Sequence, residues 1–151
     1  MMIPLGSWAF SFGPFAADPM PFEKTVERLA GAGYDGIEIC GFPPHVTLGR
    51  YPTADSRVPV VQFLQDHKLG VSGYAADFTS VNPVAPGNKQ RYLDLFQRNV
   101  QMCADIGSPS IRVDSIAAPG SIEERDYQAS FDRLADVWNA ASSIAKSAGI
   151  G

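Results

Sequence analysis

The stretch RLAGAGYDGIEI, Arg28–Ile39, shows the pattern that decides the fold. The end of a helical pattern is followed by a turn glycine and then by a short strand. The same order returns in FLQDHKLGVSGY (63–74), MCADIGSPSIRV (102–113) and, cut short, SIAKSAGIG (143–151). Successive units lie roughly 40 residues apart, which is enough for one strand, one loop and one helix. The chain is therefore predicted to be an array of four βα units.

Four helices are expected where apolar residues recur at the helical period. They are Pro21–Ala32, Val58–Lys68, Gln90–Ile106 and Asp126–Ser147. Asp55 and Ser56 are candidate caps of the second helix, and SIEE at Ser121–Glu124 has the spacing of a capping box. Each helix ends near a glycine (33, 70, 107 or 149), which we expect in the left-handed conformation.

Four short strands are expected between these helices. They are Leu5–Phe12, Gly36–Cys40, Val71–Ala75 and Ser110–Asp114. Apolar and polar residues alternate in the second of them, so that Ile37 and Ile39 stand on one face and Glu38 on the other. Strands of an open doubly wound sheet are apolar on both faces, whereas barrel strands present one face to helices and one to the barrel interior. The predicted fold class is therefore α/β, with parallel strands curving into a barrel.

The loops between strands and helices differ in length on the two ends of the predicted sheet. Helix-to-strand links are short, such as LG and GSP, whereas strand-to-helix links are long, such as GFPPHVTLGRYPTADSR and ADFTSVNPVAPGNK. Long insertions on one side mark the side where ligands bind. We expect the functional face at the carboxyl ends of the strands.

The length of the chain fits half of such a barrel. An eight-stranded barrel takes about 250 residues, and this chain has 151. Residues 1–151 are predicted to form a partial TIM-barrel domain, the N-terminal half of a (βα)8 barrel, in a truncated chain. A natural half-barrel that dimerises and a four-stranded flavodoxin-like domain are the alternatives. The half-barrel would expose its first and fourth strands as edges and inner residues such as Tyr74 to water, which predicts a homo-oligomer.

Composition narrows the class of partner. The net charge is −4 without blocks of like charge, which gives no reason to expect nucleic acid or a membrane surface as a partner. No run approaches the roughly 18 apolar residues of a membrane span. The apolar N-terminus has no basic residue before Lys24, unlike a secretory signal. A cytoplasmic protein with Cys40 and Cys103 as reduced, buried thiols is predicted.

Three segments resemble one family. GYDGIEICGF (33–42), GSWAFSFG (6–13) and SIRVDS (110–115) resemble the sugar phosphate isomerase/epimerase family, the xylose-isomerase-like TIM barrels related to endonuclease IV. The resemblance spans the whole chain and about half of a typical member. It implies a metal-dependent isomerase or epimerase of carbohydrate metabolism that moves a proton alpha to a sugar carbonyl through an enediolate.

The same resemblance implies where the chemistry lies. A divalent metal ion (Mn, Mg, Co or Zn) would be held by Glu, Asp, His and Glu at the ends of strands five to eight, and two of these carboxylates would move the proton. None of these positions occurs in the four units. We therefore expect no catalytic residue and no metal ligand in this chain, no metal bound by it, and no activity from it alone.

Glu38 and Arg112 are the first candidates for sugar binding, because both have inward parity on their strands. Glu38 is expected to accept hydrogen bonds from sugar hydroxyls, and Arg112 to hold a phosphate or carboxylate with its planar guanidinium. Asp114 shares the parity of Arg112. The alternative is charge pairing inside the barrel, with Arg112 joined to Glu38 or Asp114.

His45 and Phe12 complete the candidate set. His45 follows the second strand, where it could contact a sugar hydroxyl, and a role as zinc ligand lacks partners. Phe12 could stack on the apolar face of a sugar, with core packing as the alternative for the period-two stripe of Trp8, Phe10 and Phe12. His67 is expected to be structural, at a helix C-terminus.

Three functions compete at this point. The first is a sugar or sugar phosphate isomerase or epimerase, with this chain shaping the sugar site. The second is an endonuclease IV-like metal-dependent phosphodiesterase, which needs basic loops, yet the loop cations Arg50, Arg57, Lys89 and Arg91 are balanced by acids. The third is a non-catalytic half-barrel that dimerises and holds a sugar.

Overall fold

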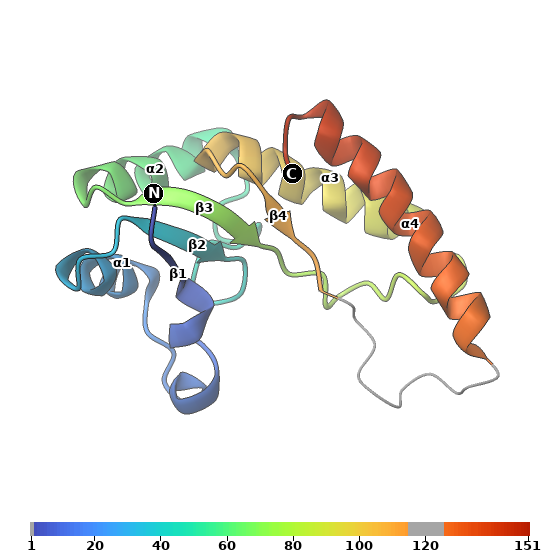
Figure 1. Cartoon of the computed structure of the whole chain (residues 1–151), viewed down its shortest axis with the longest axis horizontal. Helices are drawn as coiled ribbons and strands as arrows, with labels where there is room; N and C mark the ends of the chain where they lie inside the picture. Colours follow the sequence, from blue (N-terminus) through green and yellow to red (C-terminus); the bar gives the residue numbers. More distant parts are fainter. Residues whose placement is uncertain (1, 115–125) are drawn as a thin grey trace.

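The structure, a computed structural model, describes residues 2–114 and 126–151. One parallel sheet has the strand order β1-β2-β3-β4 (Figure 1). The strands are β1 Pro4–Gly6, β2 Gly36–Cys40, β3 Gly70–Ala75 and β4 Ile111–Arg112. The helices are α1 Phe22–Gly31, α2 Ala54–Asp66, α3 Lys89–Ile106 and α4 Tyr127–Ser147, with two short 3-10 helices, η1 Ser7–Phe10 and η2 Gly13–Phe15, after β1.

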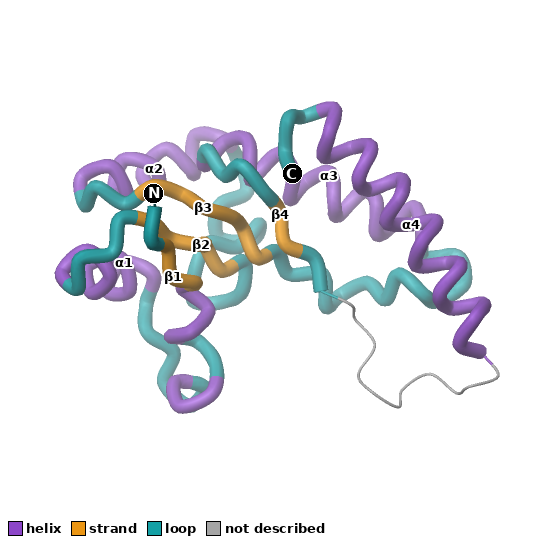
Figure 2. Tube along the Cα trace, in the orientation of Figure 1, coloured by secondary structure: helices purple, strands orange, loops and turns teal. Residues whose placement is uncertain are grey.

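The helices lie on one side of this sheet. Because each crossover between parallel neighbours is right-handed, a strictly sequential strand order places every helix on the same side. Figures 1 and 2 show α1, α2, α3 and α4 following one another around the sheet; none of the α-helices in the described part of the chain covers its other face, called the open face below. A flavodoxin-like domain has the order 2-1-3-4-5 instead. The structure thus confirms the predicted half-barrel of four parallel βα units and excludes the flavodoxin-like alternative.

The hydrophobic core fills the space between the sheet and the helices. Ile37 and Ile39 of β2 are fully buried there, against residues such as Phe22, Val26 and Leu29 of α1. Tyr74 of β3 also belongs to this core, and its hydroxyl donates a hydrogen bond of 2.9 Å to the Val46 carbonyl.

The expectation that Tyr74 faces the barrel interior is therefore wrong. A bulge between Ile37 and Glu38 shifts the register, so that Ile39 pairs with Tyr74 and Glu38 with Gly73. Partners in a parallel pair share a face, and Tyr74 consequently follows Ile39 toward the helices.

The first predicted strand is much shorter than Leu5–Phe12. Only Pro4–Gly6 pairs with β2, and η1 and η2 replace the rest. The reason lies at Ser7, because its hydroxyl takes the Cys40 N–H at 2.8 Å and so ends the main-chain ladder. Trp8, Phe10 and Phe12 are consequently no period-two stripe: Trp8 and Phe12 are exposed, while Phe10 is partly buried.

Helix α2 begins before its predicted start at Val58. Thr53 is its N-cap and shares a capping box with Ser56, so Asp55 and Ser56 lie inside the helix rather than capping it. After this helix Lys68 takes the left-handed conformation, with φ 58°, while Gly70 already belongs to β3. Glycines 33, 107 and 149 do adopt positive φ as expected. The capping-box candidate at 121–124 lies outside the described residues.

The outer edge of β4 is partly paired. The Gly151 N–H donates to the Pro109 carbonyl at 2.9 Å, and the Ile111 N–H donates to the Gly151 carbonyl at 3.0 Å. This is the hydrogen-bond pattern of a parallel neighbour. Separately, none of the helices in the described part of the chain is both long and apolar enough to cross a bilayer.

Candidate functional site

The open face of the sheet carries a polar cluster centred on Glu38. The side chains of Trp8, Glu38 and Arg112 meet there, from η1, β2 and β4. Trp8 donates its indole N–H to Glu38 Oε2 at 2.5 Å, and Arg112 Nη1 donates to the same oxygen at 3.0 Å. The alternation in β2 explains this placement, since Ile37 and Ile39 take the helix side and leave Glu38 on the other.

Arg112 is held between two carboxylates and an aromatic ring. Its guanidinium carbon lies 5.3 Å from the centre of the Trp8 ring, and its Nε lies 3.7 Å from Asp114 Oδ1. The Glu38 side chain is 23% exposed and that of Arg112 is 39% exposed. Partly solvated ion pairs of this kind stabilise a fold by about 0–1 kcal/mol. The structure thus brings Glu38, Arg112 and Asp114 together, as the charge-pairing alternative expected, while their contact with a sugar stays a prediction.

Phe12 lies at the carboxyl end of the same barrel half. Its side chain is 48% exposed and packs edge-on against Phe42, which follows β2, with ring centroids 5.7 Å apart. The ring is held by one aromatic neighbour and keeps much of its surface open. Stacking of a sugar on this ring stays a prediction.

His45 is placed quite differently from the other candidates. Its ring has no exposed surface: Nδ1 lies 2.9 Å from Ser7 Oγ, and Nε2 lies 2.9 Å from the Met20 carbonyl. Nε2 also lies 3.2 Å from Ser11 Oγ. Burial lowers the pKa of this imidazole, which fits a neutral ring that donates from Nε2 and accepts at Nδ1. His45 therefore fastens the loop after β2 to the segment after β1, and it offers no exposed atom to a sugar.

Trp8 is the site residue that the sequence pattern did not reveal. It was assigned to a packed stripe, whereas the structure gives its indole N–H to Glu38. The available signal was Gly6, because a side chain there would collide with the ring: an added Cβ would lie 2.1 Å from Trp8 Nε1. A glycine two residues before a tryptophan leaves room for the indole to fold back over the strand.

His67 and Cys40 take no part in this cluster. His67 donates a hydrogen bond from Nδ1 to the Phe63 carbonyl, 2.8 Å away, just after α2 and before the start of β3. Cys40 is fully buried, and burial raises the pKa of its thiol, which keeps it protonated and unreactive.

The metal ion that the resemblance implies finds no ligand set here. Among residues 2–114 and 126–151, no three His, Cys, Asp or Glu side chains converge closely enough to hold one. The carboxylates of Glu38 and Asp114 are both paired with Arg112. The described residues therefore do not form a metal centre by themselves.

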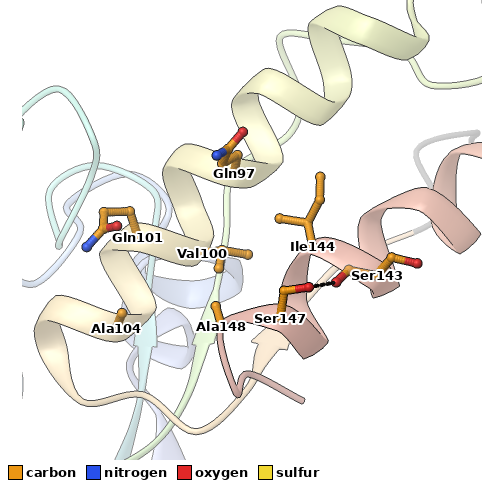
Figure 3. A pocket seen from close by; sticks show the side chains of 8 residues that line it. All are labelled: Gln97, Val100, Gln101, Ala104, Ser143, Ile144, Ser147 and Ala148. Carbon is orange, nitrogen blue, oxygen red and sulfur yellow. Dashed lines mark hydrogen bonds between the residues drawn. The ribbon is translucent and has the colours of Figure 1, made fainter.

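A further groove lies on the helix side of the molecule. It has a volume of about 460 Å³ and runs between α3 and α4, on the outer side of the helices (Figure 3). Its walls are Val100, Ile144 and small or amide side chains, and Ser147 Oγ within it donates to the Ser143 carbonyl at 2.9 Å. No titratable group lines it, so the cluster on the open face is the better candidate for chemistry.

Comparison with known proteins agrees with this architecture. The family model described as xylose isomerase-like TIM barrel matches residues 26–151. None of the curated proteins compared with the chain matches it by sequence.

Solved structures match over nearly the whole chain. A D-tagatose 3-epimerase-like protein has a TM-score of 0.71 at 14% identity, over 99% of this chain and 51% of that one. A sugar phosphate isomerase/epimerase from Parabacteroides distasonis has a TM-score of 0.69 at 19% identity, over 99% and 49%. D-psicose 3-epimerase from Clostridium cellulolyticum, solved with D-tagatose, has a TM-score of 0.62 at 14% identity, over 99% and 50%. The chain thus spans about half the length of the barrels it matches, and at these identities the likeness shows the fold.

Proposed function

Because the chain belongs to the family of xylose isomerase-like TIM barrels, we propose that the whole protein is a sugar isomerase or epimerase. In this proposal the described residues form one wall of the sugar site. The observation that carries it is the cluster of Trp8, Glu38 and Arg112 on the open face of the half-barrel. The carboxylate and the guanidinium can form hydrogen bonds with sugar hydroxyls, and the indole can pack against the C–H groups of a sugar.

Glu38 is the hydroxyl acceptor of this wall. Trp8 and Arg112 both donate to Oε2, and Oε1 has no hydrogen bond among the described residues. A carboxylate fixed through one oxygen presents the other to a ligand in a defined direction. A hydrogen bond from a sugar hydroxyl to such a charged acceptor contributes about 1.5–3 kcal/mol.

Arg112 favours a neutral sugar over a phosphate at this position. Its charge is opposed by Glu38 at 3.0 Å and by Asp114 at 3.7 Å, so little is left to attract a second anion. The exposed rings of Trp8 and Phe12 would meet the C–H faces of the sugar. The site proposed here thus comprises Phe12, Trp8, Glu38, Arg112 and Asp114.

The reaction itself is proposed for the whole protein. Proton transfer alpha to the carbonyl, through an enediolate, is the chemistry of the proposal, and a divalent metal would polarise the sugar oxygens when bound. The residues of this chain bind and orient the sugar and cover one side of it from water. Neither the acid and base nor the metal ligands are assigned to them.

The proposed reaction is tested by exchange of the hydrogen on the carbon next to the sugar carbonyl. The whole protein, supplied with Mn²⁺, is incubated with D-tagatose and D-fructose in D₂O, and the C–H group next to the carbonyl is followed by NMR. Protein-dependent exchange of that hydrogen for deuterium, with formation of the epimer, is expected. A whole protein that exchanges no C–H hydrogen in these or other ketoses and aldoses contradicts the proposal.

The variant Glu38→Gln tests whether the open face of the sheet contributes to the activity. Loss of the charged acceptor is expected to lower kcat/KM by about 10- to 100-fold, while the melting temperature changes little. Asp66→Asn is the matched control, because Asp66 bonds Gln62 on the exposed surface of α2, away from the open face. An equal loss of stability and activity in Glu38→Gln would show that the carboxylate is a structural strut.

A further inference from the structure

The residues beside Glu38 on both neighbouring strands are glycines. In the register of the sheet, Gly6 of β1 and Gly73 of β3 are the partners of Glu38. Glycine weakens a strand interior, and its presence there marks a place where something approaches the backbone closely. Gly6 has such a neighbour, because the Trp8 indole lies directly over it.

Gly73 has a smaller neighbour, the Ser110 hydroxyl. A Cβ built there would have Ser110 Oγ at 3.1 Å, Glu38 Cγ at 3.6 Å and Glu38 Oε1 at 3.8 Å as its nearest neighbours. The space above Gly73 is therefore bordered by two polar oxygens, one of which is the free oxygen of Glu38. On the other side of Glu38, an aromatic ring fills the corresponding space.

The backbone does not explain the glycine at position 73. Its φ is not positive, unlike that of the turn glycines, so a larger residue could adopt the same conformation. The bulge between β2 and β3 does not require a glycine at position 73 either. The type of bulge that requires glycine places it in the left-handed region. The glycine thus keeps space for the Ser110 hydroxyl, which an added Cβ at 3.1 Å would push aside, and for a group that approaches Glu38 Oε1 from the same side.

We propose that Gly73 is a specificity-determining residue, which lets a sugar hydroxyl reach Glu38 Oε1 and Ser110 Oγ over the bare strand. This inference rests on the proposed function and deepens it, since it names the side of Glu38 on which the sugar binds. Ser110 Oγ already donates to the Ser72 carbonyl at 3.3 Å, so it meets the sugar as an acceptor. A methyl group at residue 73 would stand between the sugar and both oxygens.

The experiment is calorimetric titration of the whole protein with D-tagatose and D-fructose. Gly73→Ala is expected to weaken binding at least tenfold while the melting temperature stays within a few degrees of the parent. Gly31→Ala is the matched control, because no atom lies within 4 Å of the added methyl group at the end of α1, and binding is expected to be unchanged. Ser110→Ala supplies a second variant, expected to weaken binding about 2- to 10-fold.

Each outcome has a separate meaning. Parent protein that binds, with Gly73→Ala binding equally well, overturns the inference and leaves the proposed function standing. If Gly73→Ala fails to fold, unchanged binding by Ser110→Ala overturns the inference in its place. Parent protein that binds neither these two sugars nor any other ketose or aldose contradicts the proposed function and the inference together.

Discussion

The two faces of the same sheet differ in polarity and in packing. On the helix side Ile37, Ile39 and Tyr74 are buried to 1% exposure or less and packed against the helices. On the open side Glu38 lies between two glycines and is held by hydrogen bonds from Trp8 and Arg112. Neighbouring residues of one strand thus differ in role: one face supplies the stability, and the other, in the proposed function, binds the sugar. The predictions below test that division, beginning with the largest effect on stability.

Ile39→Ala should destabilise the protein most. The side chain is fully buried in the core, and removing its methyl and methylene groups leaves a cavity. A loss of about 2–5 kcal/mol in the free energy of unfolding is expected, measured by denaturant titration of the whole protein. Ile3→Ala is the control, since Ile3 is 57% exposed and should change the free energy by no more than about 0.5 kcal/mol. Similar losses at the two positions would refute the assigned core.

Ser7→Ala should have the next largest effect, although Ser7 lies at the end of β1 rather than in the apolar core. Its hydroxyl accepts the Cys40 N–H and bonds His45 Nδ1, so the variant leaves two buried polar groups without partners. A loss of about 1–3 kcal/mol in the free energy of unfolding is expected. Thr53→Ala, which removes an exposed cap of α2, gives a helix-cap reference of about 1 kcal/mol. An unaffected Ser7→Ala protein would mean that this hydroxyl does not end the strand.

The pH dependence of stability should show a smaller contribution from His45. Burial lowers the pKa of this imidazole below its ordinary value of 6.5. The unfolded chain then binds a proton at a higher pH than the folded one, so the contribution is fully present above about pH 6.5 and is lost as pH falls toward the folded pKa. The free energy of unfolding, measured from pH 7.5 to 5, should fall more steeply in the parent than in His45→Gln. Equal slopes would contradict the burial of a neutral ring.

The sequence predicted best where one periodic signal acted alone. Strand β2 was expected at Gly36–Cys40 and found there, because strict alternation leaves one choice of face for Glu38. Helix α3 begins within one residue of its predicted start at Gln90 for the same reason. Alternation also placed Arg112 on the face of Glu38, where the structure has it.

The predictions were wrong where a side-chain hydrogen bond or a shift in strand register overrides the periodic sequence pattern. Leu5–Phe12 has the alternation of a strand, but the Ser7 hydroxyl takes a ladder hydrogen bond and turns the chain into η1. Tyr74 was assigned to the wrong face because a single extra residue in a bulge reverses parity. His45 and Trp8 owe their roles to partners distant in sequence, Met20 and Glu38, which a single chain without coordinates does not disclose.

The most direct test of the central claim is a crystal structure of the whole protein with a bound ketohexose. The account predicts a sugar oxygen at hydrogen-bond distance from Glu38 Oε1, on the open face of the sheet, with Trp8 and Arg112 still bonded to Oε2. A sugar bound elsewhere, with Glu38 touching only Trp8 and Arg112, would show that this cluster fills the barrel and takes no part in binding.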